Sequence, residues 1–285
     1  MWISPRRLAL AVSLLVLCPL LVFPAEKSPD PKILSLYPLG GRPGEAFTAH
    51  VRGKGLTGAS RVWVDSDHIT AQIRQVAPIQ LPAEKYPNAK SDEQQDGQRV
   101  TLRVKVGPGA EPGAYRLRLI SDRGISNPVT FLVGEEPVVV ENEGEHQLST
   151  SAQPVTVPVS VQGRISEEGE TDWYEFEAGE SEDLMFEVVC NPSVEGLLAS
   201  NDCDPRIALY EPTGSWFSPE MLTRLAVNDD AIWQTFSKSA LLAYRFPRDG
   251  RYLAKIDGHR GAGGPDEVVG TVRIHSDRPG IWYGS

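Results

Sequence analysis

Hydrophobic and polar residues alternate along much of the chain after residue 31. In residues 99–106, valine and leucine occupy every second position, and threonine, arginine and lysine lie between them. This period of two is typical of a β-strand with one buried face. Residues 115–119 repeat the pattern, and the Gly- and Pro-rich segment 107–113 separates the two runs. We therefore predict two strands joined as a hairpin.

The same pattern continues through the second half of the chain. Further strands are predicted at 173–177, 184–190, 207–210, 243–246, 251–256 and 268–274. The fourth and fifth of these are predicted to form another hairpin, and Trp173 is expected in the core. Only residues 220–226 suggest a short turn of helix. Many short strands between turns predict an all-β fold of two antiparallel β-sandwich domains.

Composition shifts indicate the domain boundaries. A polar, proline-containing stretch follows the N-terminal segment, and Glu135-Glu136-Pro137 separates two strand-rich blocks. The predicted linker, two domains and tail are 26–31, 32–134, 138–277 and 278–285. Residues 77–97 are rich in proline and charge, which predicts a long exposed loop. That loop is either a solvated insertion or a binding segment.

The N-terminal segment has the pattern of a secretory signal peptide. Arg6 and Arg7 precede an apolar run over residues 8–23, and Ala25 provides a small residue for cleavage. The run is short compared with the roughly 20 apolar residues of a membrane-spanning helix. We predict a signal peptide over residues 1–25 and a secreted or periplasmic protein. A retained membrane anchor and lipid attachment at Cys18 are the alternatives.

The charge balance narrows the choice of partners. The chain has 28 Lys+Arg and 38 Asp+Glu, and loss of the two signal-peptide arginines changes the net charge from −10 to 26 − 38 = −12. An acidic surface argues against nucleic acid and anionic membranes as partners. Beyond Cys18, only Cys190 and Cys203 remain. Export favours a disulfide between them, with two reduced thiols as the alternative.

The first block resembles an immunoglobulin-like domain of the IPT/TIG type over about residues 32–133. The matching pieces are an opening Ile33–Gly44 with Pro-x-Gly-Gly, a Gly-x-Gly-Leu at Gly53–Leu56, a Pro-Gly-x-Tyr at Pro112–Tyr115 and Ser126–Pro128. The resemblance implies an immunoglobulin-like β-sandwich.

The second block resembles a bacterial pre-peptidase C-terminal domain. The matching pieces, in order, are Val161–Ser166, Asp172–Phe176, Asp204–Tyr210, Asn228–Ala231, Phe246–Tyr252 and Gly261–Pro265. The resemblance implies a jelly-roll-like sandwich, related to the collagen-binding modules of collagenases. It also implies a role in non-catalytic binding, secretion support or module spacing.

The resemblance further implies a calcium site. In the collagen-binding relatives, an acidic stretch and an acidic loop share one calcium ion, which takes six to eight oxygen ligands. The corresponding candidates here are Glu141, Glu143, Glu170 and Asp172. Glu145–His146 replaces the Asn-Asp pair of the relatives, and histidine is a poor calcium ligand. The alternative is an acidic edge that is simply solvated.

Two other groups of residues are candidate sites. Asn228, Asp229 and Asp230 form a second acidic cluster, which is either a metal site or a turn, since these residue types favour turns. Trp216 and Phe217 lie in a turn-rich segment and are candidates for exposed aromatic binding. Their alternative is packing against the end of the sandwich.

The sequence has no motif of an enzyme active site. His-Glu-x-x-His, Gly-x-Ser-x-Gly, a phosphate-binding Gly-x-x-x-x-Gly-Lys and Cys-x-x-Cys are all missing. We predict a non-catalytic binding or accessory protein of the bacterial envelope or exterior, stabilised by calcium and binding polysaccharide or protein. The alternatives are the non-catalytic portion of a larger secreted peptidase or hydrolase, and a structural envelope spacer.

Overall fold

The predicted all-β fold is confirmed. The computed structural model describes residues 30–79, 97–142, 144, 146–165, 169–190, 205–214, 221–229, 240–258 and 268–276. Within these ranges the only helix is a short 3₁₀ segment at Ser149–Ser151, and no helix there has the length and apolarity needed to cross a membrane. The predicted signal peptide, most of the long loop and the whole of the tail lie outside the described residues.

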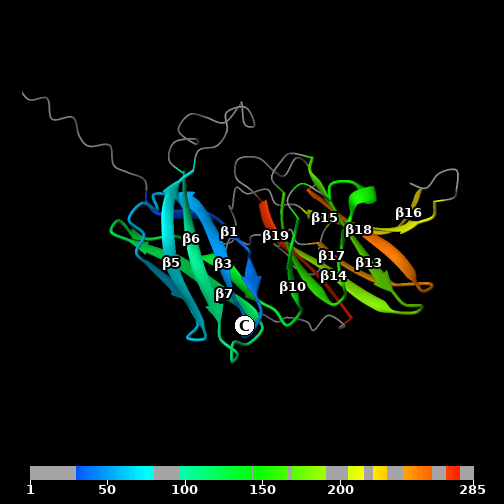
Figure 1. The fold of residues 1–285 in the computed structure, drawn as a ribbon, viewed down its shortest axis with the longest axis horizontal. Helices are drawn as coiled ribbons and strands as arrows, with labels where there is room; N and C mark the ends of the chain where they lie inside the picture. The colour runs from blue at the N-terminus through cyan, green and yellow to red at the C-terminus, as the bar shows by residue number, and fades with distance from the viewer. Residues whose placement is uncertain are drawn as a thin grey trace, which may run out of the picture.

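The N-terminal strands form a two-sheet sandwich (Figure 1). One sheet has the order β1 (Lys32–Tyr37), β3 (Ala46–Lys54), β6 (Gly97–Val106) and β5 (Ile69–Pro78). The other has the order β2 (Gly40–Gly41), β9 (Val129–Val133), β7 (Gly113–Ser121) and β4 (Arg61–Val64), with β8 (Gly124–Ile125) paired to β7. The alternating apolar residues of these strands form a continuous core that includes Leu36, Leu102 and Phe131.

The C-terminal strands form a second sandwich with two five-stranded sheets. One sheet has the order β10 (Val138–Val140), β12 (Val159–Ile165), β19 (Val268–His275), β14 (Asp183–Cys190) and β17 (Ala240–Arg245). The other has the order β11 (Gln153–Pro154), β13 (Thr171–Ala178), β18 (Gly250–Gly258), β15 (Pro205–Pro212) and β16 (Leu222–Asn228).

Both predicted hairpins are wrong. β6 and β7 belong to opposite sheets of the first sandwich, and β17 and β18 belong to opposite sheets of the second. A period of two shows which face of a strand is buried, but both sheets of a sandwich bury one face, so it does not identify the partner strand. Residues 222–228 also form a strand rather than a turn of helix. The sheets are antiparallel except for the short pairs β2–β9, β10–β12 and β11–β13.

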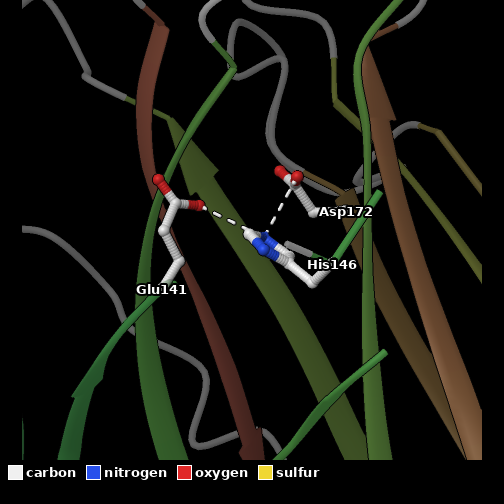
Figure 2. Close-up of side chains that lie close together, drawn as sticks. All are labelled: Glu141, His146 and Asp172. Atoms are coloured by element: carbon white, nitrogen blue, oxygen red, sulfur yellow. Dashed lines mark ion pairs between the residues drawn. The ribbon is translucent and has the colours of Figure 1, made fainter. Parts of the chain in front are cut away.

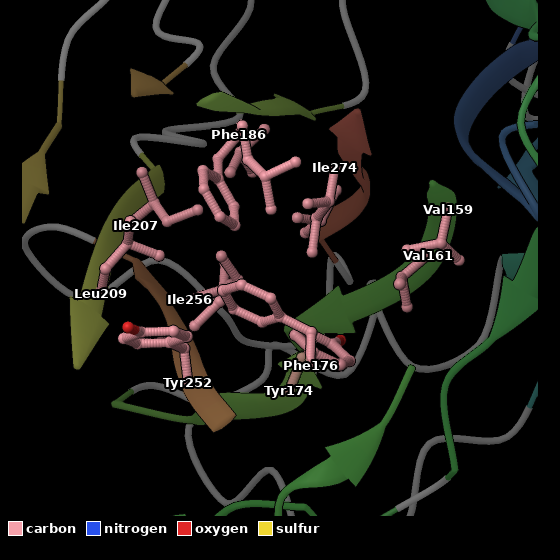
Figure 3. Close-up of a cluster of buried hydrophobic side chains, with 14 of the residues drawn as sticks. Val159, Val161, Tyr174, Phe176, Phe186, Ile207, Leu209, Tyr252, Ile256 and Ile274 are labelled. Atoms are coloured by element: carbon pink, nitrogen blue, oxygen red, sulfur yellow. The ribbon is translucent and has the colours of Figure 1, made fainter. Parts of the chain in front are cut away.

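Aromatic rings fill the core of the second sandwich (Figure 3). Phe176 contacts Phe186, Phe246 and Tyr252, with ring centroids 5.4 to 6.2 Å apart. On β13 the buried positions alternate with outward ones, so Tyr174 and Phe176 face the core while Trp173 does not. The expectation of a core Trp173 is therefore wrong, and its ring lies on the outer face of the sheet.

A buried amide joins the two sandwiches. The Gln162 side chain on β12 accepts a hydrogen bond from the backbone N–H of Leu39 at 2.8 Å. Its Nε2 donates to the hydroxyls of Ser160 and Thr271. Gln162 is 2% exposed. Because every polar group of this amide is bonded, the contact fixes the first sandwich against β12 and β19 of the second.

Candidate functional site

One cluster of buried ionisable side chains lies at the end of the second sandwich's interior (Figure 2). Glu141 directly follows β10, Asp172 is on β13, and His146 lies between them. They are 7%, 3% and 3% exposed, respectively. One carboxylate oxygen from each acid and one ring nitrogen of His146 all lie within 4.8 Å of one another.

Backbone hydrogen bonds hold Glu141 and His146, the two ends of the segment 141–146, in place. The Glu141 N–H donates to the Gln162 carbonyl at 3.0 Å, which continues the pairing of β10 with β12. The Trp173 N–H donates to the His146 carbonyl at 2.9 Å, which ties the histidine to β13. The segment therefore runs from one sheet to the other and brings Glu141, His146 and Asp172 together.

Gly163 on β12 makes room for the cluster. A Cβ atom at this position would lie 2.8 Å from Glu141 Oε2 and 3.3 Å from the Tyr174 hydroxyl. The shorter distance is a clash with a buried group that has little freedom to move. The absence of a side chain at Gly163 therefore leaves space for the Glu141 carboxylate in its present position.

The contacts within the cluster are ionic. His146 Nε2 lies 3.1 Å from Asp172 Oδ1 and 3.6 Å from Glu141 Oε2. Neither ring nitrogen of His146 and neither of these two oxygens has a partner in hydrogen-bonding geometry. The single Nε2–H group thus faces two carboxylates without pointing directly at either one.

The electrostatics favour a charged histidine. Burial alone would lower the pKa of His146, but Asp172 and Glu141 outweigh burial and raise this pKa to about 10. Burial raises the pKa of Glu141 and the pKa of Asp172, and the imidazolium opposes both shifts. At neutral pH we therefore assign an imidazolium facing two carboxylates.

Arg164 extends the cluster to the junction between the sandwiches. Its Nε lies 3.7 Å from Glu141 Oε1, and its guanidinium carbon lies 4.5 Å from the centroid of the Tyr37 ring on β1. The Tyr37 hydroxyl in turn donates to the Gln162 carbonyl at 3.4 Å. Two cations and two carboxylates are therefore arranged between the first sandwich and β13.

The structure brings together only part of the predicted calcium set. Glu141 and Asp172 lie in the cluster, whereas Glu143 is outside the described residues. Glu170 is partly exposed, and its Oε1 accepts a hydrogen bond from Gln147 at 3.2 Å. His146, which the sequence suggested was a poor ligand, lies between the two buried acids. The sequence feature that could have indicated this position is the single histidine, His146, within an acidic stretch.

These residues do not fit calcium. The ion takes six to eight oxygen ligands at 2.3–2.6 Å. Here an imidazole occupies the position between the two buried carboxylates, and its Nε2 is the nearest group to both. Among the described residues, an ion at that position would face a ring nitrogen and two buried acids.

The remaining candidates are largely outside the described residues. Asn228 ends β16, and its Nδ2 donates to the Leu241 carbonyl at 2.7 Å, so its side-chain amide joins two strands. Asp230, Trp216, Phe217 and Cys203 lie outside the described residues, as does the side chain of Cys190. The second metal site, the aromatic site and the disulfide stay predictions.

Sequence reasoning missed a second feature, an aromatic pair on the outer face of the sheet that contains β13. The rings of Trp173 and Tyr210 have centroids 5.2 Å apart at an interplanar angle of 47°. Leu253 on β18 lies between their strands, since it pairs with both Tyr210 and Glu175. Both rings are partly exposed.

Charged side chains border this pair. Arg206 makes two 2.8 Å hydrogen bonds to the Asp257 carboxylate, and Lys255 Nζ lies 2.8 Å from the same group. Lys255 Nζ is also 5.8 Å from the centroid of the Trp173 ring. Burial alone would raise the pKa of Asp257, but the two cations hold it below its usual value. Arg206 and Lys255 share the Asp257 carboxylate, and Asp229 also lies close enough to Arg206 to raise the pKa of its guanidinium.

No family model and no curated protein matches the chain. Among solved structures, the chain is similar to the pre-peptidase C-terminal domain of a Bacillus anthracis collagenase, with 11% identity over 47% of this chain and 99% of that one and a TM-score of 0.30. It is also similar to CorA, a surface-associated copper-binding protein of Methylomicrobium album, with 10% identity over 50% of this chain and 98% of that one and a TM-score of 0.27.

A third similarity spans more of the chain. It is to SGBP-B of a Bacteroides ovatus mixed-linkage glucan utilization locus, solved with a heptasaccharide, with 12% identity over 86% of this chain and 74% of that one. The TM-score is 0.25. Scores of this size do not define a shared fold, so we take the sandwich architecture from the strand pairing alone.

Proposed function

We propose that this chain is an exported, non-catalytic polysaccharide-binding protein, and that it binds through the outer face of the sheet that contains β13. The observation that carries this proposal is the Trp173–Tyr210 ring pair, partly exposed on the outer face of the sheet and bordered by charged side chains. The sequence pattern of a signal peptide supports export.

The chemistry of the face suits a sugar. Aromatic rings offer a large, rigid contact area at low entropic cost, and the C–H groups of a pyranose ring can pack against them. Arg206 and Lys255, both held by the Asp257 carboxylate, supply donors for hydroxyl groups at the edge of the rings.

The buried cluster supports a non-catalytic role. A general base must be deprotonated and within reach of its substrate. His146 is 3% exposed, and its pKa of about 10 keeps it protonated at neutral pH. The cluster is therefore better suited to holding the fold together than to acid–base chemistry.

The direct test is affinity gel electrophoresis of the purified protein through gels that contain soluble polysaccharides, both neutral and rich in uronic acids. We expect the polysaccharide gels to retard the wild-type protein. Trp173→Ala and Tyr210→Ala should each bind at least about tenfold more weakly, since each removes a central aromatic contact. Release of reducing ends should stay at background.

The matched control is Trp63→Ala. Trp63 is 42% exposed and lies on β4 of the other sandwich, so its removal should leave the retardation unchanged. Equal loss in Trp63→Ala and Trp173→Ala, or no retardation of wild-type protein on any polysaccharide, would contradict the proposal. Binding of a protein ligand that is lost in Trp173→Ala would support this face as the binding surface and would contradict polysaccharide as the ligand.

A second candidate function is that of an envelope spacer. The contact of Gln162 with Leu39, together with the stacking of Arg164 on Tyr37, favours two sandwiches held at a fixed orientation. A spacer needs that rigidity and no ligand. Small-angle scattering that fits a single rigid body, combined with no polysaccharide binding, would favour this alternative.

A further inference from the structure

We infer that the His146 ring occupies the position of a metal cation between Glu141 and Asp172, so that this module carries its cation as a side chain and folds without calcium. The inference is independent of polysaccharide binding. It concerns the cluster at the end of the second sandwich, whereas binding is assigned to the outer face of a sheet.

The geometry carries the inference. Nε2 of His146 lies 3.1 Å and 3.6 Å from oxygens of the two acids, and all three side chains are more than nine-tenths buried. Two carboxylates without a cation would be strongly unfavourable in such an environment. The ring supplies the positive charge from the position where both oxygens converge.

The surrounding groups complete the charge balance. Arg164 faces the second oxygen of Glu141 at 3.7 Å, and the Tyr174 ring lies 5.5 Å from the His146 ring. Glu170 is partly exposed, and its Oε1 accepts a hydrogen bond from Gln147. His146 and Arg164 thus balance Glu141 and Asp172, with Glu170 at the partly exposed edge.

The position of His146 in the chain allows the imidazolium to link the two sheets of the second sandwich. Glu141 is attached to β12 in one sheet, and Asp172 is on β13 in the other. An ion between them would clamp the end of the sandwich. The imidazolium makes the same link, and its own backbone carbonyl accepts a hydrogen bond from Trp173. The clamp is therefore covalently part of the chain.

The test compares thermal unfolding of the purified protein in chelator, in millimolar calcium and in zinc. A ligand that binds only the folded state raises the midpoint by mass action. We expect wild-type midpoints to agree within about 1 °C in all three conditions. A wild-type midpoint raised by about 5 °C or more in calcium or zinc would overturn the inference, because a metal would then occupy the cluster.

The substitution His146→Asp should create calcium dependence. Three buried carboxylates form a ligand set that suits calcium and repel one another without it. We expect a lower midpoint than wild type in chelator and a rise of about 5 °C or more in calcium. The control His68→Asp, at an exposed position in the first sandwich, should gain no calcium response.

A folded His146→Asp protein whose thermal unfolding midpoint is the same in chelator and in calcium would count against the inference. The space taken by the His146 ring would then not be one that a metal cation can occupy. If this variant does not fold in either buffer, the wild-type comparison still decides. A calcium response that appears in both His146→Asp and His68→Asp would also overturn it, because the effect would not come from the cluster.

Discussion

The Gln162 side chain accepts a hydrogen bond from the backbone N–H of Leu39 at 2.8 Å, across the boundary between the two sandwiches. Leu39 lies just after β1, and Gln162 is on β12, so this one contact joins segments far apart in the chain. Both residues are buried. A buried polar contact therefore helps to set the orientation of the two sandwiches.

The first prediction concerns this amide. Gln162→Ala should lower the free energy of unfolding by about 1–3 kcal/mol, because the buried Leu39 N–H loses its acceptor. Urea unfolding provides the measurement. The control is Gln147→Ala, which removes an exposed amide bonded to Glu170 and should cost less than about 0.5 kcal/mol. Equal effects of the two substitutions would show that the junction is not held by Gln162.

The second prediction concerns alkaline pH. The folded pKa of His146 is raised to about 10 from 6.5, so its contribution to stability is complete below about pH 6.5 and lost as pH rises to about 10. The slope in this window is at most about 1.4 kcal/mol per pH unit. Denaturant unfolding at a series of pH values measures it, and His146→Gln should remove most of the slope. A wild-type slope that His146→Gln leaves unchanged would assign the effect to other groups.

The third prediction concerns acidic pH. The folded pKa of Asp257 is lowered, so its contribution is present above its unfolded value near 3.8 and is lost as pH falls through the folded pKa. Asp257→Asn should therefore flatten the loss of stability below about pH 4. The same unfolding series tests this. Asp249→Asn, at an exposed position, is the control and should keep the wild-type acid limb.

The fourth prediction concerns the space for Glu141. Gly163→Ala should cost about 1–3 kcal/mol, because the new Cβ would lie 2.8 Å from Glu141 Oε2. The control is Gly179→Ala, whose Cβ would lie no closer than 3.5 Å to another atom. Thermal and urea unfolding of both variants provide the comparison. Similar stability of Gly163→Ala and wild type would mean that Glu141 can move away without loss.

The sequence was sufficient for the strands and insufficient for their partners. Alternation placed β6, β7, β13 and β18 close to their observed bounds because burial of one face imposes a period of two. It could not show that β6 and β7 lie in opposite sheets, since both have one buried face. Nor could it show that Trp173 is outward-facing, because an aromatic residue suits either face of a strand.

The sequence also predicted only part of the cluster formed by Glu141, His146 and Asp172. The sequence singled out Glu141 and Asp172 through the resemblance, but it treated His146 as a departure from the pattern. Proximity of a histidine to two acids depends on the path of the segment between the sheets, which follows from backbone bonds at Glu141 and Trp173. The backbone path of this segment cannot be predicted from residue types alone.

The charge of His146 is the central claim, because both the non-catalytic role and the built-in cation depend on it. NMR of the histidine side chains, with ¹⁵N detection of the ring nitrogens and assignment by His146→Gln, measures it directly. We predict that Nδ1 and Nε2 of His146 both stay protonated at pH 8, where ordinary histidines are neutral. A neutral ring with one unprotonated nitrogen at pH 8 would contradict the account.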